Sequence, residues 1–290
     1  MKKTVLFILS TNFSGSHFLS LLLGSHSKAA HVGEVKNLAK EKNLSIQSTN
    51  TRESTRQCYI CEKELHCSLL GDVHQLKKED IYPSIFKRLP SDVSIIIDAS
   101  KKTKWAEYFL KNNEFDVKFI HLIRDPRALV LKWMKHYKGS KAELRERIKQ
   151  VRNFPQNSIE IFSKEIEFTY ALKWSQQNRE ITNFLLKNNL NSKLITYHDL
   201  ATKPENTIKT ITEWLNLQYE NTQLNYWAHQ HHGTQKPNYD WVKEKKGQFI
   251  DLRWKNELAE EAATKIARNK QVVQLISDLK LTLNINGLEN

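Results

Sequence analysis

Four short runs of apolar and β-branched residues do most to restrict the fold of this chain. They are TVLFIL at residues 4–9, VSIIID at 93–98, VKFIHLI at 117–123 and SKLITY at 192–197. Nearly continuous runs of this kind are typical of strands buried on both faces of a parallel sheet. Each precedes a segment with helical character, at 16–23, 104–111, 128–137 and 204–215. This alternation predicts a doubly wound α/β fold that binds ligands at the carboxyl ends of its strands.

The remaining segments fit a single domain over residues 1–290. With 290 residues, of which 39% are hydrophobic, the chain is long enough to bury a substantial core. Residues 158–189 are amphipathic, and we expect the side chains at helical spacing there to face the core: Ile159, Phe162, Ile166, Tyr170 and Trp174. Residues 40–92 are polar and contain all three cysteines, which indicates an insertion rather than a second domain.

Charge and hydropathy narrow the possible partners and location. Lys and Arg number 45 against 32 Asp and Glu, a net charge of +13, which favours anionic partners or is simply a solvated basic surface. No run of about 20 apolar residues is present, so we predict no membrane span. The N-terminal apolar run is too short for a signal peptide, and the odd number of cysteines does not suggest a disulfide framework. We therefore expect a cytoplasmic protein.

The stretch STNFSGSH, residues 10–17, has the outline of a phosphate-binding turn. A strand, a tight glycine turn and a helix start together offer backbone N–H groups to an anion. Gly15 permits close approach of the backbone, and Ser14, Ser16 and His17 can add side-chain donors. The lysine of a Walker loop is absent, so an ATP-hydrolysing P-loop is not indicated. A turn with no ligand is the competing interpretation.

A second polar turn follows the strand at 117–123. The sequence RDPR places Arg124 and Arg127 at the carboxyl end of that strand, and arginine suits bidentate contact with phosphate. Lys132 follows eight residues after Arg124. The alternative is that Asp125 caps the next helix and that both arginines are solvated.

These two loops, together with several other segments, resemble sulfotransferases that use 3′-phosphoadenosine 5′-phosphosulfate. HVGEV (31–35) and IDASKK (97–102) resemble the segments in the tyrosylprotein branch and related bacterial enzymes that carry a base and a lysine. ITYHDLATKPENTIKTITEWLNL (195–217) resembles the stretch that closes the nucleotide pocket, and HQHHGTQKP (229–237) and KKGQFIDLRWKNEL (245–258) resemble C-terminal elements. The resemblance implies a P-loop-kinase-like three-layer sandwich, a central parallel sheet with helices on both faces, and sulfuryl transfer to a hydroxyl or amine.

The resemblance also implies roles for individual residues. The 5′-phosphosulfate would be wrapped by Ser14, Gly15, Ser16 and His17. Arg124 would bind the 3′-phosphate with Lys132 nearby, and Tyr197 would touch the adenine. Lys246 and Gly247 are further candidates for the 3′-phosphate. For catalysis, Lys101 would stabilise the leaving phosphate and Glu34 would serve as general base, with His17 and His31 as local rivals. A surface Glu34 and a solvated Lys101 are the competing interpretations.

Two positions depart from the bacterial pattern. Phe13 stands where many relatives have an arginine, and Lys132 stands where the family usually has a serine. Because Phe13 carries no charge where many relatives have an arginine, the alternative prediction is a catalytically inactive nucleotide-binding protein of the same fold. The opposite interpretation is that Lys132 supplies the missing charge and His17 donates to the sulfuryl oxygens.

The cysteine cluster and a histidine-rich loop are the remaining signals. Cys58, Cys61 and Cys67 would hold a structural zinc if a histidine completed the tetrahedron, but there is no second C-x-x-C, and free thiols packed in the insertion are the alternative. His229, His231 and His232 lie too close in sequence for a common metal spacing. We expect a loop that closes over the cofactor, with His232 lining the acceptor pocket.

The partner is the least determined feature. A small-molecule, glycan or peptide acceptor fits the resemblance, with a slight preference for an acidic one. A nucleic-acid-binding protein is the further alternative, but it rests only on the net charge, and no nucleic-acid-binding motif is present. The sequence contains no indication of oligomeric state.

Overall fold

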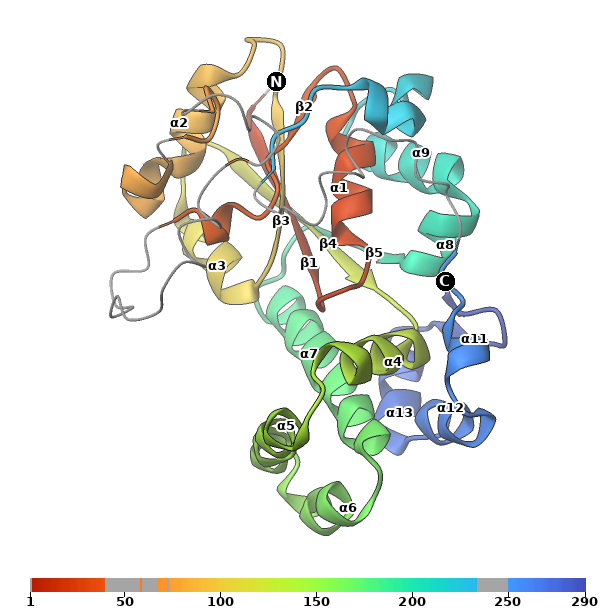
Figure 1. The fold of residues 1–290 in the computed structure, drawn as a ribbon. Coiled ribbons are helices and arrows are strands. Elements are labelled where there is room, and N and C mark those ends of the chain that lie inside the picture. The colour runs from red at the N-terminus through yellow and green to blue at the C-terminus, as the bar shows by residue number, and fades with distance from the viewer. Residues whose placement is uncertain (1, 40–57, 59–66, 72, 234–249) are drawn as a thin grey trace.

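The computed structural model describes residues 2–39, 58, 67–71, 73–233 and 250–290. Five parallel strands form the central sheet in the order β2–β3–β1–β4–β5 (Figure 1). Their bounds are β1 Thr4–Ser10, β2 Ala29–His31, β3 Ile95–Lys101, β4 Asp116–Ile123 and β5 Ser192–Thr196. All four predicted strands are confirmed. The three-residue β2 was not predicted, because it is too short to form an apolar run.

Helices connect and cover these strands. They are α1 Ser16–Gly24, α2 Ile81–Arg88, α3 Thr103–Glu107, α4 Pro126–His136, α5 Ser140–Asn153, α6 Ser158–Ser163, α7 Ile166–Lys187, α8 Tyr197–Thr202, α9 Pro204–Trp214, α11 Trp254–Glu257, α12 Glu260–Ala267 and α13 Lys270–Asp278. Short 3₁₀ helices include Val35–Asn37, Val73–Gln75, Lys78–Asp80, Tyr108–Lys111, Pro155–Asn157 and Asn221–Ala228. An antiparallel pair, β6 Thr282–Leu283 and β7 Leu288–Glu289, lies near the C-terminal end.

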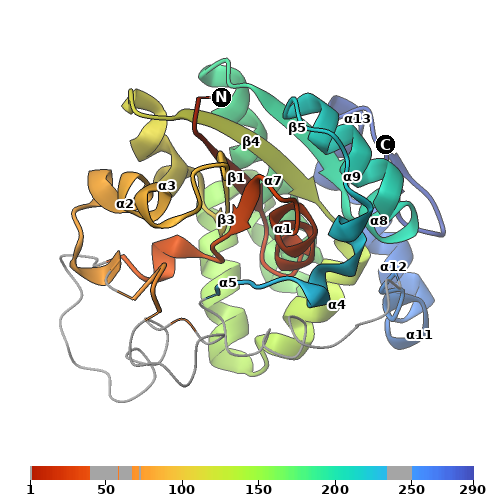
Figure 2. The same ribbon diagram turned by 90° about the horizontal axis from the view of Figure 1, so that it is seen from above.

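Alternation along β1 divides the core between the two faces of the sheet. Phe7 and its neighbours at alternate positions pack with α2, α3 and the end of α7, whereas Leu6 and Ile8 pack with α1 and α9. Figure 2 shows α2 and α3 on the opposite side of β1 and β3 from α1. The predicted three-layer sandwich with a parallel sheet is confirmed.

A third apolar cluster lies beyond the carboxyl ends of the strands. It joins α4, α7 and α13 through side chains that include Trp133 and Trp174 (Figure 1). The predicted amphipathic segment 158–189 is interrupted between α6 and α7. Tyr170 and Trp174 are buried as expected, but Ile159 is 82% exposed and Phe162 is 54% exposed, so the prediction for these two is wrong. The short α6 is anchored instead through the fully buried Ile161.

The second half of the segment 40–92 contributes to the main core. Tyr82, Ile85 and Phe86 of α2 are buried in the same cluster as Phe7 of β1, and Phe7 and Tyr82 meet edge to face at 5.6 Å between ring centroids. The two basic side chains at the end of α2, Lys87 and Arg88, are exposed and do not interrupt this face. No helix in the described part of the chain is long and apolar enough to cross a bilayer.

Candidate active site

The strand order brings the predicted polar segments to one edge of the sheet. The glycine loop follows β1, which lies between β3 and β4. Lys101 is the last residue of β3 and Arg124 immediately follows β4. Glu34 follows β2 by three residues. Because all these strands are parallel, their carboxyl ends place Lys101 and Arg124 on either side of the glycine loop.

The glycine loop has an unusual backbone. Phe13 and Gly15 both have positive φ angles, 70° and 92°. A Cβ at position 15 would lie 2.6 Å from Cδ2 of Tyr197, so only glycine fits against this ring. The nine-residue α1 starts at Ser16, and its N-cap residue is Gly15, which has no side chain to cap the helix. The first turn of α1 can therefore offer backbone N–H groups to an anion.

The serine hydroxyls of the loop are buried. The Ser14 Oγ lies 2.6 Å from the Thr11 Oγ1, so one proton of this hydroxyl pair is shared between them. Ser16 is 2% exposed. Both serines lie at the turn that leads into α1, where the sequence predicts anion binding.

Arg124 connects the turn after β4 to the glycine loop through a hydrogen bond. Its Nη1 donates to the carbonyl oxygen of Phe13 at 2.8 Å, and its Nη2 donates to the Asp251 carboxylate at 2.9 Å. The indole Nε1 of Trp174 donates to the Arg124 carbonyl at 2.8 Å and holds its backbone in place. The buried Nε has no hydrogen-bond partner among the described residues. Arg124 is thus fixed with one donor still available to an anion.

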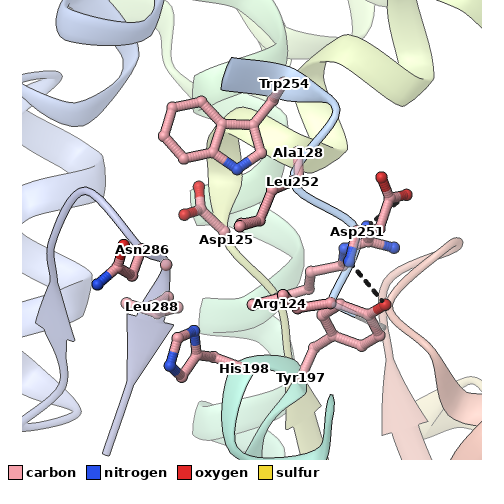
Figure 3. Close-up of a pocket in the computed structure, with 12 residues that line it drawn as sticks. Arg124, Asp125, Ala128, Tyr197, His198, Asp251, Leu252, Trp254, Asn286 and Leu288 are labelled. Atoms are coloured by element: carbon pink, nitrogen blue, oxygen red, sulfur yellow. Dashed lines mark hydrogen bonds and ion pairs between the residues drawn. The ribbon is translucent and has the colours of Figure 1, made fainter. Parts of the chain in front are cut away.

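The Tyr197 ring packs against the Arg124 side chain (Figure 3). The Arg124 guanidinium carbon lies 4.2 Å from the centroid of the Tyr197 ring, within range of a cation–π interaction. The Tyr197 hydroxyl accepts a hydrogen bond from the backbone N–H of Asp251 at 3.4 Å. The same pocket is lined by Asp125, Ala128, Leu252 and Trp254. Tyr197 begins α8 rather than ending β5, which turns its ring toward the glycine loop.

Lys101 and Glu34 meet as an ion pair on the other side of the loop. The Lys101 Nζ contacts Glu34 Oε1, and the two side chains are only 11% and 15% exposed. The Asn37 amide donates to the other carboxylate oxygen at 3.1 Å. Lys101 adopts a φ of 65° beside a bulge in β3, and left-handed backbone in a non-glycine residue is typical of functional sites.

Three histidine rings extend from the glycine loop to the loop after residue 228: those of the half-buried His17 and of the buried His31 and His231. The rings of His17 and His31 lie 5.3 Å apart between centroids, and those of His31 and His231 lie 5.8 Å apart. Burial, with the charge of Lys101 as the next cause, lowers the pKa of His17 to about 3. Burial lowers the pKa of His231 to about 4 and that of His31 well below its usual value. All three rings are therefore neutral at neutral pH.

The comparison with known proteins decides the family. A sequence model described as the sulfotransferase family matches residues 6–221, most of the chain. The chain belongs to the sulfotransferase family. No curated protein matches its sequence closely enough to count as a relative.

Solved structures of sulfotransferases share this fold. The sulfotransferase domain from the curacin biosynthetic pathway has 17% identity and a TM-score of 0.56, with 96% of this chain and 98% of that chain covered. The sulfotransferase domain from the Synechococcus PCC 7002 olefin synthase has 16% identity and a TM-score of 0.52, with 98% of both chains covered. At these identities the likeness shows the fold alone.

Most of the predicted site residues of this sulfotransferase converge. Ser14, Gly15, Ser16, His17, Glu34, Lys101, Arg124 and Tyr197 lie along the carboxyl edge of the sheet or on the elements that begin there. Lys132, on α4, lies with its Nζ 5.5 Å from the centroid of the Phe13 ring. Lys246, Gly247 and Cys61 lie outside the described residues.

One sequence-based interpretation needs correction, and one contact was not foreseen. Arg127 is not a solvated arginine: it forms a buried bidentate ion pair with Asp125, which also caps α4, and it stacks on Trp254 at 3.9 Å. The Nδ1 of His232 lies 3.1 Å from the Cys67 Sγ, and its place in the acceptor pocket stays a prediction. The separation of 165 residues between them hid this contact from the sequence.

The sequence analysis assigned no role to two acids of the sulfotransferase site. Asp251 pairs with both Arg124 and Arg253, and hydrogen bonding to Arg253 is the main cause that lowers its pKa. Asp98 is fully buried in β3, accepts hydrogen bonds from Ser100 and Trp105, and thereby holds the bulge that presents Lys101. A lone acid in the apolar run VSIIID was the available signal for Asp98.

Proposed function

We propose that this member of the sulfotransferase family transfers the sulfuryl group of 3′-phosphoadenosine 5′-phosphosulfate to an acceptor hydroxyl or amine. The supporting observation is the arrangement of two buried cations, Lys101 and Arg124, on either side of the open N-terminus of α1. A donor with two separate anionic groups suits this arrangement. Membership of the tyrosylprotein branch stays a prediction.

The glycine loop and Arg124 would hold the donor. The backbone N–H groups at Gly15 and in the first turn of α1 would bind the 5′-phosphosulfate, together with the hydroxyls of Ser14 and Ser16. Arg124 would bind the 3′-phosphate, for which its Nε lacks a partner among the described residues. Tyr197 would support the nucleotide from below Arg124, and Lys132 would add positive charge near Phe13.

The transfer itself requires a base and a cation. The acceptor oxygen attacks sulfur and forms a new S–O bond, while the bond from sulfur to the bridging oxygen of the 5′-phosphate breaks. Glu34 would take the proton of the acceptor hydroxyl, because its carboxylate lies beside Lys101 at the carboxyl edge of the sheet. Negative charge develops on the departing 5′-phosphate, and Lys101 would stabilise it. The product nucleotide is adenosine 3′,5′-bisphosphate.

His17 would assist as a neutral donor rather than as a cation. Its lowered pKa keeps the ring uncharged, and its buried Nε2 has no hydrogen-bond partner within the described part of the chain. A neutral imidazole N–H can donate to a sulfuryl oxygen, whose negative charge is retained through the reaction. The adjacent His31 lies behind His17, where it would exclude water.

The acceptor side of the site is positively charged. Partial burial lowers the pKa of Lys102, and the charges of three other lysines lower it further: Lys101, Lys149 and Lys36. Such a cluster favours an acceptor that carries negative charge of its own, whether a small molecule, a glycan or a peptide. The hydroxyl of this acceptor would approach through the space next to Glu34.

Calorimetric titration would test nucleotide recognition first. We expect adenosine 3′,5′-bisphosphate to bind at least about tenfold more tightly than adenosine 5′-monophosphate, since only the former has a 3′-phosphate for Arg124. Equal affinities would contradict the assigned 3′-phosphate site.

Transfer is then measured with 35S-labelled donor and a mixed panel of hydroxyl and amine acceptors, anionic and neutral. The proposal is supported if label moves to an acceptor and if this transfer is lost when Glu34 is replaced. Tight binding of adenosine 3′,5′-bisphosphate, with no transfer to any acceptor and no hydrolysis of the donor, would favour the inactive nucleotide-binding protein instead.

A further inference from the structure

Two thiols and an imidazole meet outside the proposed catalytic residues. Cys58, Cys67 and His232 each offer one ligand atom, and these three atoms all lie within 4.8 Å of one another. Both cysteines are buried and neither forms a disulfide. We propose that Cys58, Cys67 and His232 bind a structural zinc ion.

The distances suit this ion. Tetrahedral zinc has Zn–S bonds of about 2.3 Å and Zn–N bonds of about 2.0 Å, so its ligand atoms lie about 3.3–3.8 Å apart. The Cys67 Sγ and the His232 Nδ1 are already 3.1 Å apart. All three separations are at most 4.8 Å, so side-chain rotations that move the ligand atoms by about 1 Å would complete the geometry. Two thiolates with one imidazole favour zinc over the hard cations Mg²⁺ and Ca²⁺.

Backbone hydrogen bonds prepare the sulfur atoms for a metal. The N–H of Leu70 donates to the Cys67 Sγ at 3.3 Å, and the N–H of Gly233 donates to the Cys58 Sγ at 3.4 Å. Donors of this kind stabilise thiolates and orient metal ligands. The second hydrogen bond comes from Gly233, the residue next to His232, so both chain segments of the site help to orient the sulfur atoms. The described residues supply three protein ligands, and Cys61 lies outside them.

The ion would connect two distant parts of the chain. Cys67 belongs to the segment that leads into the α2 core, whereas His232 follows the 3₁₀ helix Asn221–Ala228. His231, the neighbour of His232, packs against His31, and its Nε2 lies 2.7 Å from the Tyr226 carbonyl oxygen. A metal at this point would hold the 231–233 loop against the histidine rings beside the glycine loop. Binding of the metal does not depend on sulfuryl transfer, so metal analysis tests it separately.

The test uses the full chain, purified without a histidine tag from cells grown with added zinc. Elemental analysis after dialysis is expected to find about one zinc ion per chain. Cys67→Ser and His232→Ala should each retain less than about one tenth of that metal, because each removes a ligand. His229→Ala is the matched control from the same loop, since His229 lies 3.1 Å from a backbone carbonyl oxygen and belongs to no group of metal ligands among the described residues.

Measurements on the wild-type chain keep the proposal testable if the ligand variants fail to fold. Cobalt(II) added to the metal-free wild-type chain should produce the absorption bands of tetrahedral thiolate coordination. Zinc should also protect Cys58 and Cys67 from alkylation, as read from the peptide masses. Absence of bound metal, full metal content in both ligand variants, or a Cys58–Cys67 disulfide in the freshly purified chain would each overturn the proposal.

Discussion

The ammonium group of Lys132 lies 5.5 Å from the centre of the Phe13 ring. The two positions that depart from the bacterial sulfotransferase pattern are therefore neighbours, although 119 positions separate them in the sequence. We predict that Lys132, on α4, supplies the positive charge that Phe13 does not bring to the glycine loop. The cation–π contact holds the lysine close to the loop. The two departures can be understood as one compensated change.

This relationship predicts that Lys132 contributes to nucleotide binding. Lys132→Gln should weaken the binding of adenosine 3′,5′-bisphosphate by about 1 kcal/mol, through a lost charged interaction. The matched control is Lys135→Gln on the same helix, where the lysine pairs with Glu257 instead. Titration calorimetry on both variants measures the difference. An equal effect of the two substitutions would mean that only net charge matters, and the compensation would be disproved.

Gly15 is predicted to be required for both conformation and space. Gly15→Ala should lower the free energy of unfolding by about 2 kcal/mol or more, because the residue has a positive φ and its Cβ would strike Tyr197. Gly139→Ala is a suitable control, since Gly139 has a φ of 105° but nothing within 4 Å of its would-be Cβ. Urea unfolding of both variants separates backbone strain from the clash. If they lose equal stability, the Tyr197 contact imposes no constraint.

Glu34 is predicted to affect turnover more than nucleotide affinity. Glu34→Gln keeps the shape of the side chain but removes its basicity, so kcat should fall by about 10²–10⁴ with little change in bisphosphate affinity. Glu34→Asp, which retains a carboxylate, should recover part of the rate. Near-normal turnover in Glu34→Gln would exclude Glu34 as the base, and His31 would become the next candidate.

Arg124 and Asp251 lead to opposite predictions for nucleotide affinity. Arg124→Ala should weaken bisphosphate binding by about 1.5–3 kcal/mol through a lost charged hydrogen bond. The Asp251 carboxylate occupies one Arg124 donor and repels an incoming phosphate. Asp251→Asn should therefore tighten binding by about 1 kcal/mol. Calorimetry on both variants checks the pair; weaker binding in Asp251→Asn would show that Asp251 mainly orients Arg124.

Buried histidines predict a loss of stability in acid. Burial lowers the pKa of His17 to about 3 and those of His121 and His231 to about 4. In the unfolded chain these rings take up protons near pH 6.5, so the unfolded state binds more protons between about pH 4 and 6.5. Stability is then fully present above pH 6.5 and decreases as the pH falls through this window.

The size of this effect can be measured. These three histidines and His31, whose pKa burial also lowers, should together lower the free energy of unfolding by about 4–5 kcal/mol between pH 7.5 and 5.5. Urea unfolding at both pH values provides the comparison. His121→Gln should reduce the pH dependence by about one quarter, because it removes one of the four contributing rings; the amide can keep the 3.1 Å contact with the Asn178 side chain. An unchanged pH dependence in that variant would contradict the assignment.

The sequence by itself determined the sheet and its loops. Continuous apolar runs can be satisfied only by strands buried on both faces, and their carboxyl ends must share one edge when the strands are parallel. This is why the Gly15 loop, Lys101 and Arg124 could be predicted to lie together. Short elements escaped prediction: β2 has three residues, and the exposed Ile159 shows that spacing alone does not decide which face packs.

Only the tertiary structure decided which distant side chains become partners. The contacts of Lys132 with Phe13, of Arg124 with Asp251 and of His232 with Cys67 each join separate segments of the chain. Local propensity and periodicity act over a few residues, whereas these contacts depend on how the packed layers bring the loops together. For that reason the type of chemistry could be read from the sequence, but the pairing of its charged groups and the possible metal ligands could not.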